Sequence, residues 1–372
     1  MFAVLTQAAL ADEREQAKRL HDRLAGVPAT ETTLTSMAAD IGAGAAIDAA
    51  FTAMEDPAFY AVTLKNFAAP WTNRDQTVFV PLNDYIATVV GMIRDDVPFD
   101  GVLSADVLYV GDASLGLPPY SMNNNDHYQQ IEDRHIDLKN NLVRTTQSAV
   151  TDLPAEATAG VMTTRAASEA FFVDGTNRAM FRFTLLNHLC HDLEQVKDGT
   201  RSPDRIRQDV SRSPGGDSRI FLNNCIACHS GMDPLAQAFA YYDFDKSNGR
   251  LVYTAGEVQP KYHINATNFS PGFITPDDQW KNYWRSGQNS VLGWDTSLPA
   301  GGNGAKSLGQ ELAASDAFAQ CQVKKVFRNV CFREPSDSAD RARIDSMVAS
   351  LRANNYSLKQ VFAESAVYCM GD

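Results

Sequence analysis

The chain has 372 residues and a formal net charge of −12, with 44% hydrophobic and 21% charged residues. This composition is ordinary for a globular protein, and a chain of this length can build a hydrophobic core without disulfide bonds. The negative charge and the lack of a Lys/Arg run argue against nucleic acid as a partner, because a phosphate backbone is bound by clustered cations. No stretch approaches the roughly 20 apolar residues that span a bilayer, so we expect no transmembrane segment.

The first eleven residues resemble the end of an export signal. Residues 1–11 read MFAVLTQAALA, an apolar run that ends in an A-x-A pattern directly before Asp12 and Glu13. The basic residues that open a signal peptide are missing and the apolar part is short, so we interpret residues 1–11 as a truncated signal segment. A first helical turn is the alternative. Export would place the protein in the periplasm or outside the cell.

Helical periodicity dominates the chain. Apolar residues at helical spacing predict helices over residues 13–24, 44–54 and 179–193. Near the C-terminus, Ser336 is expected to cap a helix that runs to Arg352, and Ser357 to cap a helix over residues 358–368. Strand-like runs are few, with residues 105–110 and 250–254 as the best candidates. We therefore predict a mainly α, multi-helical fold with few short strands.

Three loop-like stretches divide the chain, at residues 151–160, 211–218 and 299–309. They suggest a helical N-terminal region over residues 12–215, a central segment over residues 216–298 and a helical C-terminal region over residues 299–372. We find no internal repeat in the sequence.

The central segment carries the most informative motif of the chain. Residues 225–229 read CIACH, which is the C-x-x-C-H attachment signature of a c-type haem. In such a site the cysteines form thioether bonds to the haem vinyl groups, and the adjacent histidine is an axial ligand of the iron. We therefore expect one covalent haem c, attached to Cys225 and Cys228, with His229 as the axial ligand. Residues 216–298 would then form an atypical cytochrome c-like haem segment embedded in the helical fold.

Other kinds of site share the C-x-x-C pattern. A thioredoxin-type motif would follow a strand within a βαβ unit, and no such unit is evident. A zinc site would need a second close pair of ligands, and Cys321 and Cys331 are too far apart to form one. A disulfide between Cys225 and Cys228 would close a tight ring. Because the chain has only six cysteines, C-x-x-C followed directly by His is improbable by chance, and haem is the favoured interpretation.

The other four cysteines are Cys190, Cys321, Cys331 and Cys369. Four cysteines allow three pairings, and the sequence does not select among them. Pairing Cys321 with Cys331 is the most local choice, because it closes a short loop. Buried free thiols are the alternative.

The ligand on the opposite face of the iron decides whether the haem only transfers electrons or also binds small molecules. The candidates are His263, His188, His191 and Met370, and an open position is the remaining alternative. His188 and His191 are three residues apart on the helix expected over residues 179–193, so they are predicted to share a face. Each histidine taken alone more often has a structural role than a ligating one.

The residues around and after the motif resemble those of a known family. CIACH continues as SGMDPL and is followed by Phe244, Asp245, Gly249 and Arg250. This context resembles the planctomycete-type cytochrome c proteins, in which C-x-x-C-H lies within domains of unknown function. In that family an acidic-proline pair and an F-D-x-x-G-x-R stretch follow the motif. Here the glycine of that stretch comes one place late.

The resemblance extends over residues 219–368, because residues 327–368 are similar to that family's terminal helical domain. It implies a haem at Cys225, Cys228 and His229 and a location on the export side of the membrane. The family's activity is itself poorly defined. From the resemblance we also expect Arg250 to pair with a haem propionate, with an ordinary surface salt bridge as the alternative.

Together, these patterns predict an exported monohaem c-type cytochrome that carries out single-electron transfer. A redox partner protein is expected, but the sequence does not identify it. The alternative is a haem enzyme, oxidase- or peroxidase-like, with an open or weakly held sixth iron position. The polarity and access around the iron separate the two functions.

Overall fold

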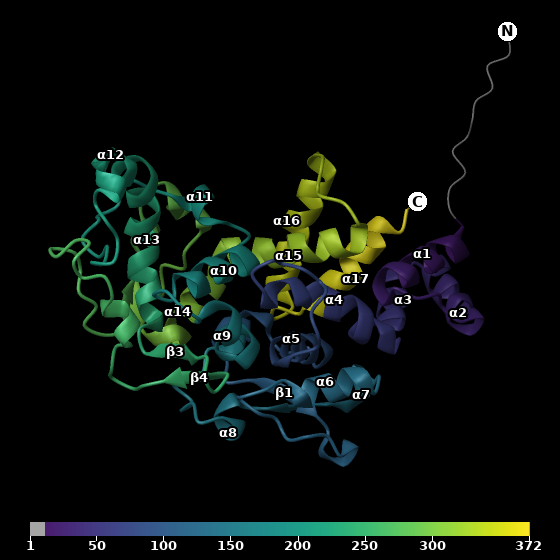
Figure 1. The fold of residues 1–372 in the computed structure, drawn as a ribbon. Coiled ribbons are helices and arrows are strands. Elements are labelled where there is room, and N and C mark those ends of the chain that lie inside the picture. The colour runs from purple at the N-terminus through teal and green to yellow at the C-terminus, as the bar shows by residue number, and fades with distance from the viewer. Residues whose placement is uncertain (1–11, 372) are drawn as a thin grey trace, which may run out of the picture.

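The computed structural model describes residues 12–371 and is mainly helical, as predicted (Figure 1). The proposed signal segment, residues 1–11, lies outside the described residues. The helices of the N-terminal region are α1 (Glu13–Ala25), α2 (Glu31–Gly42), α3 (Ala46–Met54), α4 (Lys65–Ala68), α5 (Asp84–Arg94), α6 (Asp126–Asp133), α7 (Leu138–Asn141), α8 (Gln147–Val150), α9 (Arg165–Phe171), α10 (Arg178–Leu189) and α11 (Leu193–Val196). The later helices are α12 (Ser218–Ile220), α13 (Ile226–Ala236), α14 (Gly304–Ala313), α15 (Asp316–Cys331), α16 (Ser338–Ala353) and α17 (Leu358–Cys369).

Within residues 12–371 the strands form three separate antiparallel pairs. The strands are β1 (Leu108–Gly111), β2 (Leu142–Thr145), β3 (Tyr242–Asp245), β4 (Arg250–Tyr253), β5 (Gln279–Lys281) and β6 (Gly301–Asn303). Each pair joins consecutive strands: β1 with β2, β3 with β4, and β5 with β6. β1 and β4 overlap the two strand-like runs found in the sequence, so the expectation of few short strands is confirmed.

The predicted terminal helices are confirmed, with small shifts at their ends. α1 is capped by the side chain of Asp12 and stops at Gly26, which adopts a left-handed conformation with φ 73°. α17 is capped by Ser357, as predicted. The N-cap of α16 is one residue later than expected. The side chain of Asp337, rather than that of Ser336, accepts a hydrogen bond from the backbone N–H of Asp340 in the first turn.

The helix expected over residues 179–193 ends earlier, at Leu189. Cys190 adopts a left-handed backbone conformation with φ 57° and closes α10. His191 therefore lies beyond the end of the helix. The prediction that His188 and His191 share one helical face is wrong. Helical periodicity does not show that the helix ends at Cys190, which forms a disulfide bond with Cys321.

The stretch over residues 299–309 also differs from the expectation of a loop. It forms β6 and the first turns of α14. Its glycines suggested a turn, but they permit close packing instead. A Cβ atom on Gly301 would come within 2.7 Å of the carbonyl oxygen of Trp280 in the neighbouring strand β5.

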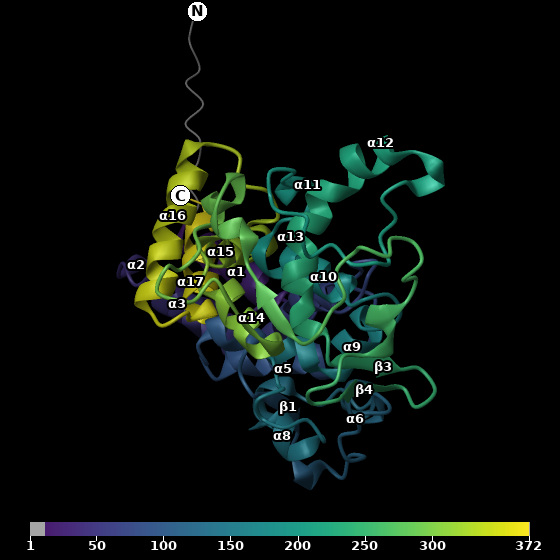
Figure 2. The ribbon, with the colours of Figure 1, turned by 90° about the vertical axis from the view of Figure 1, so that its left-hand side faces the viewer.

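One hydrophobic core connects elements from the three regions of the sequence. α1 and α3, near the N-terminus, pack against α17, and α10 packs against both α13 and α15. Figures 1 and 2 show α12 and the beginning of α13 at a corner of the molecule, away from α1, α3 and α17. α10 therefore links the central segment to the C-terminal helices. Within residues 12–371, no helix is both long enough and apolar enough to cross a membrane.

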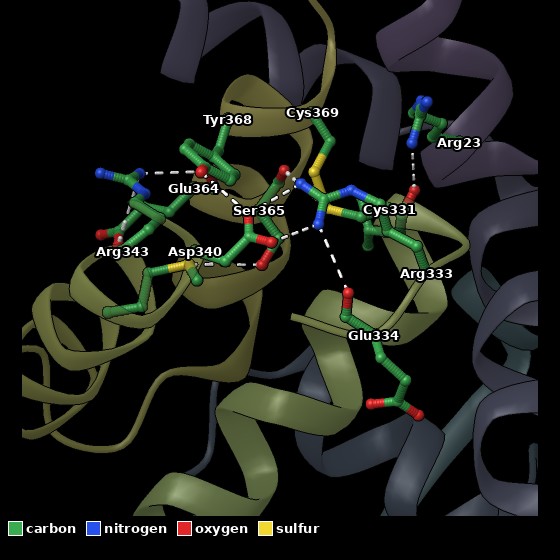
Figure 3. The surroundings of a disulfide bond; sticks show 12 residues. Arg23, Cys331, Arg333, Glu334, Asp340, Arg343, Glu364, Ser365, Tyr368 and Cys369 are labelled. Atoms are coloured by element: carbon green, nitrogen blue, oxygen red, sulfur yellow. Dashed lines mark hydrogen bonds and ion pairs between the residues drawn. A yellow bond between two sulfur atoms is a disulfide. The ribbon is translucent and has the colours of Figure 1, made fainter. Parts of the chain in front are cut away.

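Two disulfide bonds join the helices. Cys190 at the end of α10 is bonded to Cys321 of α15, and Cys331 at the end of α15 is bonded to Cys369 at the end of α17 (Figure 3). The local pairing of Cys321 with Cys331 is wrong. Both residues belong to the same straight helix, where ten residues correspond to a rise of about 15 Å, too far for a disulfide.

An ion pair fastens the C-terminal helices beside the second disulfide (Figure 3). Arg333 reaches Asp340 of α16 with both terminal nitrogens, and Tyr368 of α17 donates its hydroxyl proton to the same carboxylate over 2.9 Å. The backbone N–H of Ser336 donates to it as well, over 2.8 Å. These hydrogen bonds, that of Arg333 first, hold the pKa of Asp340 well below its usual range.

Candidate haem attachment site

The C-x-x-C-H motif spans the end of a π-helical turn and the beginning of α13, with Cys225 as the last residue of the turn and Cys228 and His229 in the first turn of α13. α12 leads into this turn, Phe221–Cys225, and the α-helix resumes at Ile226. The buried Phe221 anchors the turn, with the guanidinium of Arg212 over its ring at 4.9 Å. π-helical turns are rare and occur often at functional sites. The segment before the motif is helical, whereas a thioredoxin-type site would follow a strand.

Cys225 and Cys228 lie on one helical turn, and both are partly exposed free thiols. The other four cysteines are consumed by the two disulfides, so Cys321 and Cys331 cannot complete a zinc site with the motif. Burial raises the pKa of the Cys228 thiol, whose Sγ lies 3.7 Å from the carbonyl oxygen of Leu193. A raised pKa is the opposite of what thiol–disulfide exchange requires.

His229 is oriented by Asp233, which follows four residues later on the same face of α13. Nδ1 of His229 lies 3.1 Å from Oδ1 of Asp233. The Asp233 side chain is 0% exposed, while that of His229 is 19% exposed. No residue of the described chain hydrogen-bonds to Nε2 of His229, so this nitrogen is available to a ligand. Histidines that ligate metals commonly donate their second nitrogen to a carboxylate in this way.

Two arginines surround the buried carboxylate of Asp233. Arg178, the first residue of α10, donates from Nε and Nη2 to the two oxygens of Asp233, over 2.7 Å and 3.0 Å. The other edge of the same guanidinium forms a second two-bond pair with Asp209. Nη2 of Arg207 lies 3.9 Å from Oδ1 of Asp233. Burial favours the protonated acid, but the positive charges, that of Arg178 first, outweigh it and hold the pKa of Asp233 well below its usual range.

Sequence reasoning missed this support of His229. The spacing of His229 and Asp233, four residues apart on a predicted helical turn, was a signal that could have indicated their contact. Arg178, Arg207 and Asp209 come from distant parts of the chain, and only the packing of α10 against α13 brings Arg178 to the motif.

Two of the proposed sixth ligands are held by other contacts. His188 is buried, with Nε2 2.8 Å from the hydroxyl of Tyr85 and its ring against that of Trp71. Met370 follows α17, and its carbonyl oxygen accepts a hydrogen bond from Arg19 of α1. In both ribbon views α1 and α17 lie away from α12 (Figures 1 and 2). The structure does not bring either residue to the motif.

The two remaining histidine candidates differ in position. His191 lies beyond the end of α10, with Nδ1 2.6 Å from the carbonyl oxygen of Leu189. His263 is exposed on a loop of the central segment. The preceding Tyr262 donates its hydroxyl proton to the carbonyl oxygen of Ala236, the last residue of α13, over 3.1 Å. Both histidines thus lie on segments that pack against the motif's own helix: Leu193, two residues after His191, has its carbonyl oxygen 3.7 Å from Sγ of Cys228, whereas the His263 loop contacts the other end of α13.

Arg250 does not face the motif. As the first residue of β4, it forms an ion pair with Asp152 and contacts Sδ of Met122 at 3.6 Å. The structure therefore favours the ordinary salt bridge over the expected pairing with a haem propionate.

Among residues 12–371, no group of three or more His, Cys, Asp or Glu side chains is placed to hold a metal ion. A c-type haem makes a different demand on the chain: two cysteines for its vinyl groups and one or two axial ligands for its iron. Cys225, Cys228 and the oriented His229 meet that demand.

Comparison with known proteins identifies no relative of this chain. No protein-family model matches it. No curated protein and no solved structure matches it either. The likeness to planctomycete-type cytochrome c proteins therefore rests on the sequence patterns within residues 219–368 alone.

Proposed function

We propose that this protein is an exported monohaem c-type cytochrome that transfers single electrons. The haem is attached through thioether bonds to Cys225 and Cys228, and His229 is its axial ligand. The observation that carries the proposal is the pair of free thiols, Cys225 and Cys228, followed directly by a histidine whose Nδ1 lies 3.1 Å from the buried Asp233.

The donor set supports haem rather than another cofactor. The two thiols and the imidazole lie within two consecutive turns at the start of α13, and Nδ1 of His229 is already engaged. When bound, the haem supplies the one-electron couple of its iron. Asp233 accepts a hydrogen bond from Nδ1–H of His229 and so makes the imidazole a stronger donor to the iron, while Arg178 keeps Asp233 ionised in the protein interior.

Apolar side chains near the motif also support the proposal. Ile220 and Leu222, just before the motif, are 41% and 58% exposed. The loop that carries His263 lies close by, because Arg212 stacks on both Phe221, at 4.9 Å, and Phe269 of that loop, at 4.1 Å. Exposed apolar residues gathered at one place commonly mark a binding surface, and a porphyrin would cover such a surface.

The disulfide bonds support the export side of the proposal. Structural disulfides form and persist in oxidising compartments such as the periplasm and the extracellular space. The bonds Cys190–Cys321 and Cys331–Cys369 use every cysteine outside the motif. This division of the six cysteines leaves Cys225 and Cys228 for haem.

A haem enzyme is the second candidate function, and the Asp233 carboxylate is the observation that favours it. A carboxylate on Nδ1 raises the basicity of the ligating imidazole and so stabilises oxidised iron. An oxidase- or peroxidase-like protein would use this together with an open sixth position.

The spin state and ligand binding of the iron distinguish the two functions. We suggest optical spectra of the protein matured with a haem-attachment system, recorded oxidised and reduced, with and without carbon monoxide. A low-spin spectrum that carbon monoxide does not change is expected for electron transfer. A high-spin iron that binds carbon monoxide readily would overturn electron transfer in favour of the enzyme. Replacing His263 by Ala would show whether this residue occupies the sixth position.

A further inference from the structure

A cavity of about 480 Å³ lies where the end of α10 meets α15, at the opposite end of α10 from Arg178. Its walls come from α4 and the 3₁₀ turn after it, from the last residues of α10, and from α15. The Cys190–Cys321 disulfide holds α10 and α15 together at this point. The volume lies within the range of small-molecule sites in proteins.

Lys325 of α15 places a buried amino group on the wall of this cavity. Lys325 is 8% exposed, and its Nζ lies 3.1 Å from the centroid of the Trp71 ring. One of its three N–H donors goes to the carbonyl oxygen of Asn187. Among residues 12–371, no carboxylate lies within ion-pair distance of Lys325. A buried charge without a counter-ion is costly, so an anion at this place would be stabilising.

The electrostatic surroundings of Lys325 agree with this geometry. Burial lowers the pKa of Lys325 well below its usual range, and the positive charge of Arg328 lowers it further. Arg328 also lines the cavity, and it pairs with Glu334, an exposed residue that lies outside it, over 3.0 Å. The lining contains no acidic side chain. With no counter-ion, burial disfavours the charged form of Lys325, and a carboxylate bound beside Nζ would restore it.

The remaining walls are flat and apolar or carry amides. Phe67 and Trp71 meet edge to face, with ring centroids 4.8 Å apart. Asn329 also lines the cavity, while the amide of Asn187 is already hydrogen-bonded to the carbonyl oxygen of Trp71 and to Gln76. A positive charge next to aromatic walls is suited to a ligand with an anionic end and an apolar body.

We propose that this cavity binds a small organic carboxylate with a flat apolar body. The carboxylate pairs with Lys325, and the apolar body lies against Phe67 and Trp71. The proposal does not depend on haem at the motif, because every residue that carries it lies outside residues 216–298.

Calorimetric titration of the full-length protein with benzoate tests the proposal, with benzamide as the neutral probe of the same shape. Benzoate is expected to bind at least about tenfold more tightly than benzamide, because only benzoate forms a charge-assisted pair with Lys325. Lys325→Met is expected to remove this preference. Lys324→Met is the matched control. Lys324 is the residue before Lys325 in α15, is exposed and does not line the cavity, so this variant should bind benzoate as the unmodified protein does.

Equal affinity for benzoate and benzamide, or no benzoate binding at millimolar concentration, would overturn the proposal. So would unchanged benzoate binding in a folded Lys325→Met protein. If that variant does not fold, Asn329→Asp serves instead, because it adds a negative charge at the half-exposed rim. Asn329→Asp is expected to weaken benzoate binding several-fold and to leave benzamide unaffected. Unchanged benzoate affinity in Asn329→Asp would contradict the carboxylate site.

Discussion

Nδ1 of His229 lies 3.1 Å from Oδ1 of Asp233, and the same carboxylate accepts two hydrogen bonds from Arg178, the first residue of α10. A partly exposed imidazole at a corner of the molecule is thereby tied to the interior through one buried acid. Because α10 packs against both α13 and α15, the orientation of His229 depends on the core that these helices share. A histidine with only a surface role would not need such a buried partner.

Replacing Asp233 by Asn is expected to raise the reduction potential of the proposed haem. The variant removes the negative charge on Nδ1, so the imidazole becomes a weaker donor and oxidised iron loses stabilisation. We expect a rise of roughly 60 mV or more, which is a tenfold change in the equilibrium constant of a one-electron couple. Spectroelectrochemical titration measures it.

Asp209→Asn is the matched control for this prediction. It removes the other carboxylate on Arg178 but makes no contact with His229. Its shift in potential should be clearly smaller than that of Asp233→Asn. An unchanged potential in Asp233→Asn, with the haem retained, would show that the acid does not act on the iron.

Gly231 is expected to tolerate no side chain. A Cβ atom there would lie 2.0 Å from Nε1 of Trp284, which is fully buried. Gly231→Ala should therefore push Trp284 off α13 and lower the free energy of unfolding by about 1–3 kcal/mol, despite the better helix propensity of Ala. Gly199→Ala is the control, because its Cβ would meet the Cβ of Ala227 at 3.9 Å, an ordinary contact with the same helix. Thermal unfolding compares them, and equal stability of the two variants would contradict the packing.

The two disulfides are expected to differ in their effect on stability. Cys190 and Cys321 are 131 residues apart, and Cys331 and Cys369 are 38 apart. Since a longer closed loop restricts the unfolded chain more, removing the first bond should cost about 1 kcal/mol more than removing the second. Denaturant unfolding of the two double-serine variants measures this. A non-reduced peptide that links Cys321 to Cys331 would contradict the pairing itself.

Asp340 is expected to make the protein sensitive to acid. Its folded pKa is depressed, chiefly by the hydrogen bond from Arg333, so its contribution is fully present well above the unfolded pKa of about 3.9. The free energy of unfolding should fall as the pH drops below about 4, when the unfolded chain takes up a proton more readily. Asp340→Asn should be less stable at pH 7 and show a flatter fall below pH 4. Asp345→Asn, an exposed position on the same helix, should keep the steep fall, and identical pH profiles for the two variants would refute the role of the ion pair.

Local features of the fold could be predicted from the sequence, and long-range ones could not. Gly26 and Ser357 mark helix ends through their own backbone and side-chain chemistry, so α1 and α17 were placed correctly. The end of α10 at Cys190 is set by a bond to Cys321, and no pattern near residue 190 reveals it.

In the candidate site, too, the local features could be predicted from the sequence and the long-range ones could not. The motif itself is contiguous in the sequence, and so is the His229–Asp233 pair within one helical turn. Arg178, which keeps the acid ionised, is 55 residues from Asp233 and is brought there only by the packing of α10 on α13. The sequence leaves His188 as a possible ligand, because its burial against Trp71 depends on tertiary packing that the sequence does not reveal.

The central claim is tested most directly by whether the chain carries covalent haem. We suggest mass measurement of the denatured protein after maturation with a haem-attachment system, together with the pyridine haemochrome spectrum. One haem per chain, retained after denaturation and lost in the Cys225→Ser, Cys228→Ser double variant, is the predicted result. A folded wild-type chain that carries no covalent haem under these conditions would contradict the account.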